Sequence, residues 1–330
     1  MILVTGGAGY IGSHCVLRFL REKFDCVIFD NLSNSSEKTV ETLKKYGNVE
    51  LFQGDLRNKN DLEKCFQQYK IDGILHFAGL ILVGESVVEP DKYYDNNVYG
   101  TLNLYEIAKK YGVKKIVFSS SCAVYGEPKY VPIDEKHPLN PINPYGQTKM
   151  IAEKIAEDFD KAYGIKTVRL RYFNVAGCET FLGENHNPET HLIPNIVKSM
   201  LDGNSFFKMF GDDYETSDGT CIRDYVNVKD LANAHVLAYK YLSEKNTSNV
   251  FNIGTEKGSS VKEIIAAVEL VTSKKINVEV CPKREGDAAV LLANSSKAKE
   301  ILGFNPTETL ENSLKTAYEY EQKKREVAVK

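Results

Sequence analysis

A tyrosine, a lysine and a serine near the middle of the chain have the types and spacing needed to take a proton from a hydroxyl group. Tyr145 and Lys149 lie four residues apart in NPYGQTKM, which places them on one face of a predicted helix. Lowering the pKa of a tyrosine from ~10 to ~7 requires about 4 kcal/mol, and the ammonium and a positively charged cofactor can supply much of it. Ser121 in SSSCAVYG can hydrogen-bond the same oxygen. The set predicts general-base chemistry at a carbinol.

The spacing alone is weak, because a tyrosine precedes a lysine by four residues at seven places in the chain. Tyr145 stands out because it follows Pro144 at a helix start, after one predicted strand and before another. The other six matches begin at Tyr105, Tyr111, Tyr125, Tyr225, Tyr241 and Tyr320. Of these, Tyr105, on a helix before the strand, and Tyr320, on the charged tail, are interpreted as core or surface aromatics. The hydroxyls of Ser119 and Ser120 are interpreted as caps of a strand end.

A glycine-rich turn near the start of the chain predicts a dinucleotide site. TGGAGYIGSH follows a predicted strand and opens a predicted helix, with glycines at Gly6, Gly9 and Gly12. This spacing permits a tight turn, a close approach of the backbone to a pyrophosphate, and close packing of the helix on the strand. The free N–H groups and the dipole of the helix N-terminus favour a phosphate there.

An acid at the end of the second predicted strand indicates which dinucleotide binds. Asp30 can accept hydrogen bonds from the ribose hydroxyls and would repel a 2′-phosphate, and no arginine follows it in NLSNSSEK. NAD is therefore favoured over NADP. A loop cap is the alternative role for Asp30. Asp55, after a third strand, is predicted either to contact adenine or to cap a helix.

The first half of the chain alternates apolar runs with helical periods. Short continuous apolar strands between helices predict a parallel sheet covered on both faces, in a doubly wound α/β fold of the Rossmann type. The predicted strands are 2–5, 26–30, 49–53, 73–77, 115–119 and 167–172, and the predicted helices include 11–22, 92–111 and 145–163.

The second half has a different texture, rich in Gly, Asn, Pro and acidic residues between predicted helices at 192–201, 229–241, 261–271 and from Leu310. We interpret residues 1–174 as the dinucleotide-binding domain and 175–330 as a smaller substrate-binding lobe. Some later segments, such as CIRDYVNVKDLA, are expected to return to the first domain.

Composition excludes several classes of protein. The net charge of -3 gives no basic excess for nucleic acid or an anionic membrane. No apolar run is long enough to span a bilayer, and Met1 leads directly into a strand, so we expect no membrane segment or signal peptide. Seven scattered cysteines predict reduced thiols in a cytoplasmic protein. His186 and His191 lie in a Pro-containing loop, and no metal site is expected.

Beyond these motifs, the chain resembles the UDP-glucose 4-epimerases, a family of extended short-chain dehydrogenases/reductases. The resemblance runs from Ile2 to about Pro306. The glycine turn and NPYGQTK are shared across the superfamily. The more specific segments are HFAGL, VGESV, YYDNN, RYFN, HLIP and REGD.

The resemblance implies which residues contact the ligands. Contacts to NAD are expected at Gly6, Gly9, Tyr10, Ile11, Gly12, Asp30, Asn31, Asn34, Ser35, Asp55, Leu56, Phe77, Ala78, Gly79, Asn96, Tyr145, Lys149 and Phe173. Contacts to a UDP-hexose are expected at Ser121, Tyr145, Asn174, His191, Leu192, Arg223, Arg284, Asp287 and Leu291. An arginine fork suits a diphosphate, although an arginine is more often in a surface ion pair, for which Asp224 or Asp287 is the obvious partner of Arg223.

The activity that the resemblance implies is reversible inversion at C4 of UDP-galactose and UDP-glucose, as a homodimer built through paired helices such as 92–111 and 145–163. Two positions depart from many relatives. Ile81 replaces a polar or basic residue, which removes a contact to the cofactor or the tyrosine. Leu291 stands where some relatives have a bulky tyrosine, which leaves room for an N-acetylated sugar.

Four other functions are compatible with parts of this pattern. A 4,6-dehydratase would need an acidic pair where Cys122 and Ala123 follow Ser121. An enzyme acting on UDP-glucuronate, by epimerisation or decarboxylation, would need a cation facing the sugar carboxylate. A non-enzymatic NAD sensor would not need the intact Ser121, Tyr145 and Lys149. A simple alcohol dehydrogenase would exchange its cofactor freely.

Overall fold

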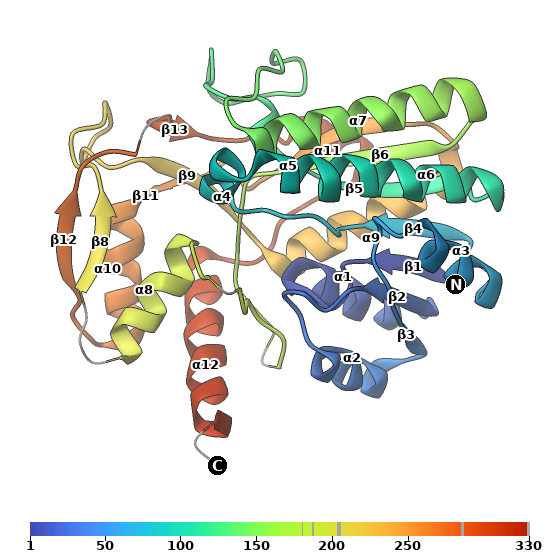
Figure 1. The fold of residues 1–330 in the computed structure, drawn as a ribbon. Helices are drawn as coiled ribbons and strands as arrows, with labels where there is room; N and C mark the ends of the chain where they lie inside the picture. The colour runs from blue at the N-terminus through green and yellow to red at the C-terminus, as the bar shows by residue number, and fades with distance from the viewer. Residues whose placement is uncertain (180, 187, 203–205, 285–286, 329–330) are drawn as a thin grey trace.

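A sheet of seven parallel strands forms the centre of the molecule in the computed structural model, which describes residues 1–179, 181–186, 188–202, 206–284 and 287–328. The strand order is β10-β6-β5-β4-β1-β2-β3 (Figure 1). Successive strands are therefore added outward from β1 on one side as far as β3, and then from β4 on the other side. The predicted doubly wound α/β fold is confirmed. The strands are β1 (Ile2–Thr5), β2 (Cys26–Asp30), β3 (Val49–Gln53), β4 (Gly73–His76), β5 (Lys115–Ser121), β6 (Lys166–Tyr172) and β10 (Asn249–Ile253).

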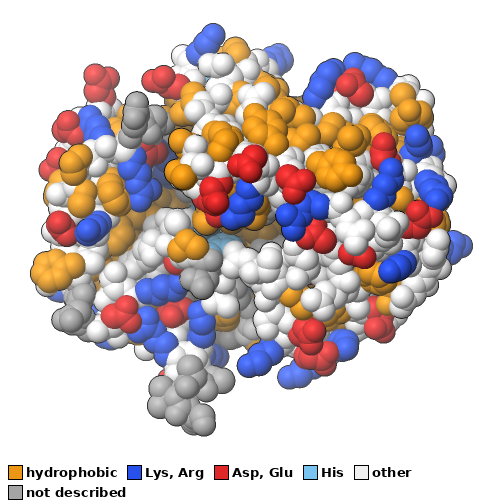
Figure 2. All heavy atoms as spheres, viewed as in Figure 1, with side chains coloured by type: hydrophobic (Ala, Val, Ile, Leu, Met, Phe, Trp, Pro, Cys, Tyr) orange, Lys and Arg blue, Asp and Glu red, His pale blue; other side chains and the backbone are white. Residues whose placement is uncertain are grey.

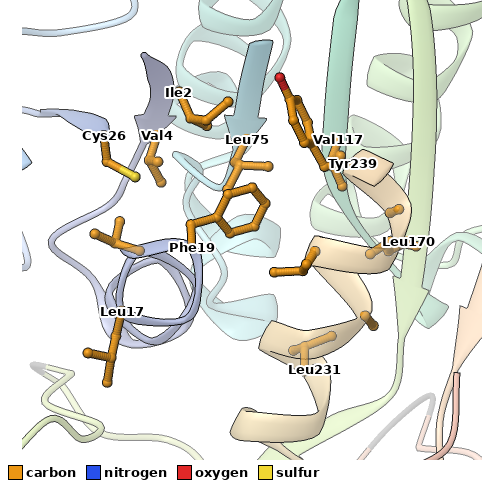
Figure 3. Packing of buried hydrophobic residues seen from close by; sticks show 14 of the residues in the cluster. Ile2, Val4, Leu17, Phe19, Cys26, Leu75, Val117, Leu170, Leu231 and Tyr239 are labelled. Carbon is orange, nitrogen blue, oxygen red and sulfur yellow. The ribbon is translucent and has the colours of Figure 1, made fainter. Parts of the chain in front are cut away.

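Helices cover both faces of this sheet, and apolar side chains fill the two interfaces. One face packs against α1 (Tyr10–Arg21), α2 (Glu37–Leu43), α9 (Val228–Lys245) and α11 (Ser296–Leu302). Phe19 of α1 and Leu231 of α9 belong to this core with Leu75 and Val117 of the sheet (Figure 3). The other face packs against α3 (Lys59–Gln68), α6 (Gly100–Lys110) and α7 (Pro144–Tyr163). Burial on both faces explains why the strands are continuous apolar runs.

The predicted helix 92–111 is helical in the structure as far as Lys110, but it is not one regular α-helix. The structure divides this segment into α5 (Pro90–Tyr93), a π-helical turn η2 (Tyr94–Tyr99) and α6, after the short α4 (Val83–Val88). The π-helical turn has a physical reason, since Asn97 is buried and its amide bonds to both backbone groups of Leu80 at 2.8 and 3.0 Å. Two 3₁₀ turns, η1 (Lys44–Tyr46) and η3 (Cys122–Val124), complete this half.

A smaller lobe lies beside the carboxyl edge of the sheet, at the left of Figure 1. It contains the helices α8 (Leu192–Leu201), α10 (Val261–Thr272) and α12 (Leu310–Ala328), which share one apolar cluster. Its strands form two small sheets: β7 (Asn174–Ala176), β9 (Ile222–Asn227), β11 (Gly258–Ser260) and β13 (Val290–Leu291) in one, and β8 (Phe206–Phe210) and β12 (Asn277–Cys281) in the other.

The chain passes between the two parts more than once after residue 174. The strand β9 belongs to the small sheet, but α9 packs against α1, and β10 pairs with β6 in the large sheet. The division at 174/175 therefore stays a prediction, with α9, β10 and α11 lying on the large sheet. No helix in the described ranges is both long and apolar enough to cross a membrane.

Candidate active site

The glycine turn lies where β1 ends and β4 runs beside it. Gly6 has φ +68°, and a Cβ there would lie 2.6 Å from the backbone nitrogen of Ala78. A Cβ on Gly12 would lie 2.2 Å from the Gly6 carbonyl oxygen, so this position must stay bare for α1 to approach β1. At Gly9 a Cβ would meet one protein atom, at 3.4 Å. The protein therefore leaves room over Gly9 at the start of α1, which the predicted pyrophosphate contact requires.

Asp30 is buried at the end of β2 and is held by three donors. Its carboxylate accepts hydrogen bonds from the backbone N–H groups of Ala8 at 3.0 Å and Leu32 at 2.9 Å, and from the Ser35 hydroxyl at 2.9 Å. These bonds join Asp30 to the glycine turn and to its own loop. Asp30 thus has the loop-capping role that the sequence offers as the alternative. Its contact with the ribose stays a prediction.

Asp55, after β3, is held by Arg57 and Asn31. The Arg57 guanidinium donates to its carboxylate at 2.7 and 3.0 Å, and the Asn31 amide donates at 3.0 Å. The hydrogen bonds from Arg57 hold the pKa of Asp55 well below its usual range. The arginine that follows β3 is therefore already paired with a carboxylate, and does not point to a free 2′-phosphate site.

The loop after β4 carries Phe77, Ala78 and Gly79, which the sequence predicts as cofactor contacts. It is anchored by Asn97, which sequence reasoning missed in favour of its neighbour Asn96. Asn96 donates to the Asn97 side-chain oxygen at 2.9 Å, and Asn97 donates to the Thr148 hydroxyl at 3.1 Å. The two consecutive asparagines of YYDNN are the signal that could have found it.

The proposed proton-transfer residues meet at the carboxyl end of β5. Helix α7 begins at Pro144, with the Asn143 side chain accepting from the Gly146 N–H at 2.9 Å. One turn later the Lys149 ammonium, which is buried, donates to the Ser119 carbonyl at 2.8 Å and lies 5.9 Å from the centre of the Tyr145 ring. Ser121 is the last residue of β5, and its oxygen accepts from the Ala123 N–H at 3.2 Å.

The electrostatics of this group differ from the sequence expectation in one respect. Burial raises the pKa of Tyr145 to about 12, opposed by a hydrogen bond with Ser121. Burial also lowers the pKa of Lys149 to about 8, opposed by the charge of Glu153. The protein groups alone therefore do not bring the tyrosine toward pH 7. A tyrosine in this place becomes a base near neutral pH only when a further positive charge lies beside it.

The two predicted diphosphate arginines lie in different surroundings. Arg223 is buried on β9 and donates to the Asp287 carboxylate at 2.8 Å, which is the ion pair that the sequence offers as the alternative role. Asp224 is engaged elsewhere, accepting from the N–H groups of Thr255 and Glu256 at 2.8 and 3.0 Å. Arg284 is exposed, and its guanidinium carbon lies 4.0 Å from the centre of the Phe210 ring. The sequence did not connect Phe210 with this site.

A cluster of two histidines and two glutamates was not expected from the sequence. The ligand atoms of Glu184, His186, Glu189 and His191 lie within 4.8 Å of one another and could hold a metal ion. His191 Nδ1 lies 2.6 Å from Glu184 and 3.2 Å from Glu189. Burial lowers the pKa of His191, but the two carboxylates outweigh it and raise the pKa to about 10. The two carboxylates thus stabilise the charged form of the His191 imidazole.

Several other predicted contact residues are also engaged within the protein. The Tyr10 hydroxyl donates to the Gly177 carbonyl at 2.6 Å, and Leu56 is buried in the core. Phe173 and Leu291 pack together in a small cluster beside β13, and Leu291 is paired in register with Arg223. Asn174 begins β7, Leu192 begins α8 after His191, and Ile11 lies in the first turn of α1.

A polar pocket of about 460 Å³ lies where the loop after β2 faces the lobe, lined by Asn34, Ser35, Asn185, His186, Lys198 and Lys324. Asn34 and Ser35 are predicted cofactor contacts, so this pocket borders the adenosine end of the predicted cofactor site. The space-filling view shows the lobe and the larger part meeting along a hollow (Figure 2).

Comparison with known proteins agrees with this geometry. The family model described as GDP-mannose 4,6 dehydratase matches residues 3–317. The UDP-glucose 4-epimerase of Lactobacillus helveticus is 48% identical over 322 residues, which cover 97% of this chain and 96% of that protein.

Solved structures are also similar over nearly the whole chain. The UDP-glucose 4-epimerase of Bifidobacterium longum in complex with NAD⁺ and UDP is 38% identical, with a TM-score of 0.94 and coverage of 98% of both chains. The UDP-Glc/GlcNAc 4-epimerase of Campylobacter jejuni is 40% identical, with a TM-score of 0.86 and coverage of 98% and 99%. These relatives match nearly the whole chain, which includes the seven-stranded sheet and the segments that carry Ser121, Tyr145 and Lys149. The chain belongs to the UDP-glucose 4-epimerase family of extended short-chain dehydrogenases/reductases.

Proposed function

We propose that this protein interconverts UDP-galactose and UDP-glucose by inverting C4 of the sugar, with a tightly held NAD. The observation that carries the proposal is the grouping of Tyr145, Lys149 and Ser121 at the carboxyl end of β5, in the same sheet as a glycine turn with room for a pyrophosphate. NAD, when bound, would accept a hydride from C4 and return it to the opposite face, so that no net oxidation occurs. The turn over Gly9, Asp30 and the loop of Phe77 to Gly79 would hold it.

The protein residues would move the proton. Tyr145 in its phenolate form takes the proton of the 4-hydroxyl and gives it back to the same oxygen after the sugar has turned over. Ser121 bonds the same oxygen, and the Lys149 ammonium stabilises the phenolate. The cationic nicotinamide ring would supply the further positive charge that the buried tyrosine needs.

The UDP part would be held firmly and the hexose loosely, because a firm grip on one sugar face would prevent rotation of the 4-keto intermediate. Arg223 and Arg284 are the donors suited to the diphosphate, since a guanidinium fork matches phosphate oxygens. His191, Leu192 and Asn174 would contact the nucleotide side. Binding energy remote from C4 then retains the reactive intermediate.

Dehydration is the nearest competing reaction, and the family model bears the name of a dehydratase. Elimination across C5 and C6 needs an acid and a base after the serine. In this chain Cys122 and Ala123 occupy those places, in the 3₁₀ turn η3. Burial raises the pKa of the Cys122 thiol to about 12, so the thiol is no base near pH 7. This chemistry favours epimerisation.

The test is incubation of the purified protein with UDP-galactose without added nicotinamide. We expect UDP-glucose to form, and Tyr145→Phe to abolish its formation. Tyr320→Phe is the matched control, because Tyr320 and Lys324 repeat the same spacing on α12, and this variant should remain active. Absence of product from UDP-galactose, UDP-GalNAc and UDP-glucuronate, even with added NAD⁺, would contradict the proposal. Product from UDP-glucuronate alone would favour the competing sugar-acid reaction, and a stoichiometric need for NAD⁺ would favour a simple dehydrogenase.

N-acetylated sugars are a second substrate class. Leu291 lies beside Phe173 and Cys122 in the cluster next to η3, so a larger side chain at 291 would fill space near the catalytic serine. The Campylobacter jejuni relative is named for both UDP-Glc and UDP-GlcNAc. We expect Leu291→Tyr to lose turnover of UDP-GalNAc but to keep that of UDP-galactose, measured side by side. Equal losses of turnover for both sugars would show that Leu291 does not determine substrate specificity.

We also propose that the protein acts as a cytoplasmic homodimer. Its cysteines are all free thiols. Exposed apolar side chains gather on α4 and η2, where Val87 and Val88 are 61% and 81% exposed and Tyr94 and Tyr99 are also exposed. Apolar surface appears on this face in Figure 2. A patch of this kind supports the proposal of a subunit interface. Sedimentation of the wild type and of Val88→Lys tests the proposal, with a dimer expected for the wild type and a monomer for the variant.

A further inference from the structure

A buried ion pair lies directly behind the proton-transfer pair. Glu153 of α7 is one helical turn beyond Lys149, and both side chains are almost fully buried. The Arg171 guanidinium donates to both carboxylate oxygens of Glu153, at 2.8 and 2.5 Å. The Ser120 hydroxyl donates to the same carboxylate at 2.5 Å. Because Ser120 and Arg171 face each other in register on β5 and β6, Glu153 ties α7 to both strands.

The arginine is fixed from its other side. Its remaining nitrogen donates to the Tyr125 hydroxyl at 3.0 Å, and Tyr125 donates to the Asn252 side chain of β10 at 2.6 Å. Asn252 in turn donates to the Ile133 carbonyl at 2.8 Å. Each buried member that these bonds connect has a partner, so the carboxylate of Glu153 is held in one position relative to β5.

We propose that Glu153 is a positioning residue for the proton-transfer pair: it fixes α7 against β5 and β6 through Ser120 and Arg171, and it places a buried negative charge one helical turn from the Lys149 ammonium. The inference rests on the proposed function. Sequence reasoning assigns neither Glu153 nor Arg171, whose side chains meet only in the folded sheet. Lys149 can act on Tyr145 only while it carries its proton and stays on the Ser119 carbonyl.

The charged and titratable groups around Lys149 come from several elements. Tyr145 and Glu153 share its helix, His76 faces it from β4, and Arg171 lies behind Glu153 on β6. The aromatic ring of Phe118 lies 5.1 Å from the ammonium. The charge of Lys149 lowers the pKa of His76, in addition to the larger effect of burial, so that imidazole is neutral. Among these groups Glu153 is the one whose charge favours the ammonium.

Burial is the force that opposes the ammonium. It lowers the pKa of Lys149 to about 8, and the charge of Glu153 limits this decrease. Removing the carboxylate charge would lower the pKa further and leave the positive charge of Arg171 uncompensated. Lys149 would then lose its proton within the pH range in which the enzyme works. The alkaline limb of the rate profile would move to lower pH.

The experiment compares Glu153→Gln with wild type by two readouts. The first is the titration of Lys149 in protein labelled with ¹³C at the lysine ε-carbons, with its resonance identified through Lys149→Met. The second is the pH dependence of kcat with UDP-galactose. We expect both midpoints to fall by about 1 unit, with little change in KM. The matched control is Asp158→Asn on the same helix, where an exposed carboxylate pairs with Lys154 at 3.3 Å. Neither midpoint should move in that variant.

The double variant Glu153→Gln/Arg171→Met covers the case in which the single variant does not fold, because it removes both buried charges together. Its Lys149 midpoint should also fall. An unchanged Lys149 titration in either folded variant, accompanied only by lower thermal stability, would overturn the proposal and leave Glu153 as a structural anchor. The NMR readout does not depend on turnover. If the wild type converts no UDP-sugar, the proposed function is contradicted. The titration of Lys149 would still decide whether Glu153 acts on the ammonium.

Discussion

The two sides of the site differ in how their polar groups are partnered. On the large sheet, Lys149 is bonded to a backbone carbonyl, and Gly9 leaves open space, so this side needs little rearrangement to receive a ligand. On the lobe, Arg223 is paired with Asp287 and His191 with two glutamates. A diphosphate arriving there must compete with carboxylates. On the proposed function, the cofactor and catalytic side is preorganised, whereas the substrate side would exchange internal partners for the ligand.

Loss of the ammonium should have the largest effect. Lys149→Met removes the charge that stabilises the Tyr145 phenolate, so we expect kcat to fall by at least about 100-fold. Kd for UDP should stay unchanged, because Lys149 belongs to the sheet side. Kinetics with UDP-galactose and calorimetry with UDP measure the two quantities. A large loss of UDP affinity in Lys149→Met would show that the catalytic side and the UDP-binding side are not independent.

The reverse pattern is expected on the lobe. Arg223→Gln removes a charge-assisted donor, worth about 1.5–3 kcal/mol, so Kd for UDP should rise by about 10- to 150-fold. The value of kcat at saturating sugar should change much less. Lys283→Gln is the control, because this neighbouring cation is exposed and pairs with Asp213 at 3.2 Å. Equal effects of the two variants on UDP affinity would show that net charge, not Arg223 itself, matters.

A smaller effect is expected from restoring a cation near the tyrosine. Ile81 lies in the loop between Gly79 and α4, and Ser86 of α4 accepts from the Tyr145 N–H at 3.2 Å. In Ile81→Lys an added ammonium should oppose the effect of burial on the Tyr145 pKa and move the acidic limb of kcat to lower pH. NAD should also be retained better through purification, measured by cofactor release on denaturation. Ile81→Met, which adds length without charge, should change neither quantity.

The smallest effect concerns stability on the lobe. Because the folded pKa of His191 is raised to about 10 from about 6.5, its ion pairs contribute fully below about pH 6.5 and are lost as the pH rises through 10. The imidazole is 41% exposed, so solvent screens part of this contribution. Thermal unfolding of wild type and His191→Gln should therefore differ most at low pH and converge toward pH 10. A difference that is constant with pH would show that the ion pairs contribute nothing.

Much of the catalytic half could be predicted because its signals are local. Glycine spacing after a strand, an acid at the end of the next strand, and a tyrosine and lysine one helical turn apart are all readable within short segments. The π-helical turn at Asn97 could not be predicted, since it depends on hydrogen bonds between the Asn97 side chain and the backbone of Leu80 in the loop after β4. The lobe was less predictable, because its short strands pair with distant segments, as β13 does with β9.

The amino-acid sequence by itself determined the order of strands and helices in the first half of the chain, the glycine turn, and the placing of Tyr145 and Lys149 on one helix face, because periodicity and backbone freedom are local properties. The tertiary structure alone decided which charges became partners. Arg223 pairs with Asp287, and Glu153 with Arg171, only after segments far apart in the chain have packed together. The pairing of His191 with Glu184, seven residues earlier, depends on the folded course of the segment that carries both. Burial then decided the pKa of Tyr145 and Lys149, because desolvation depends on everything packed around a group and not on its neighbours in sequence.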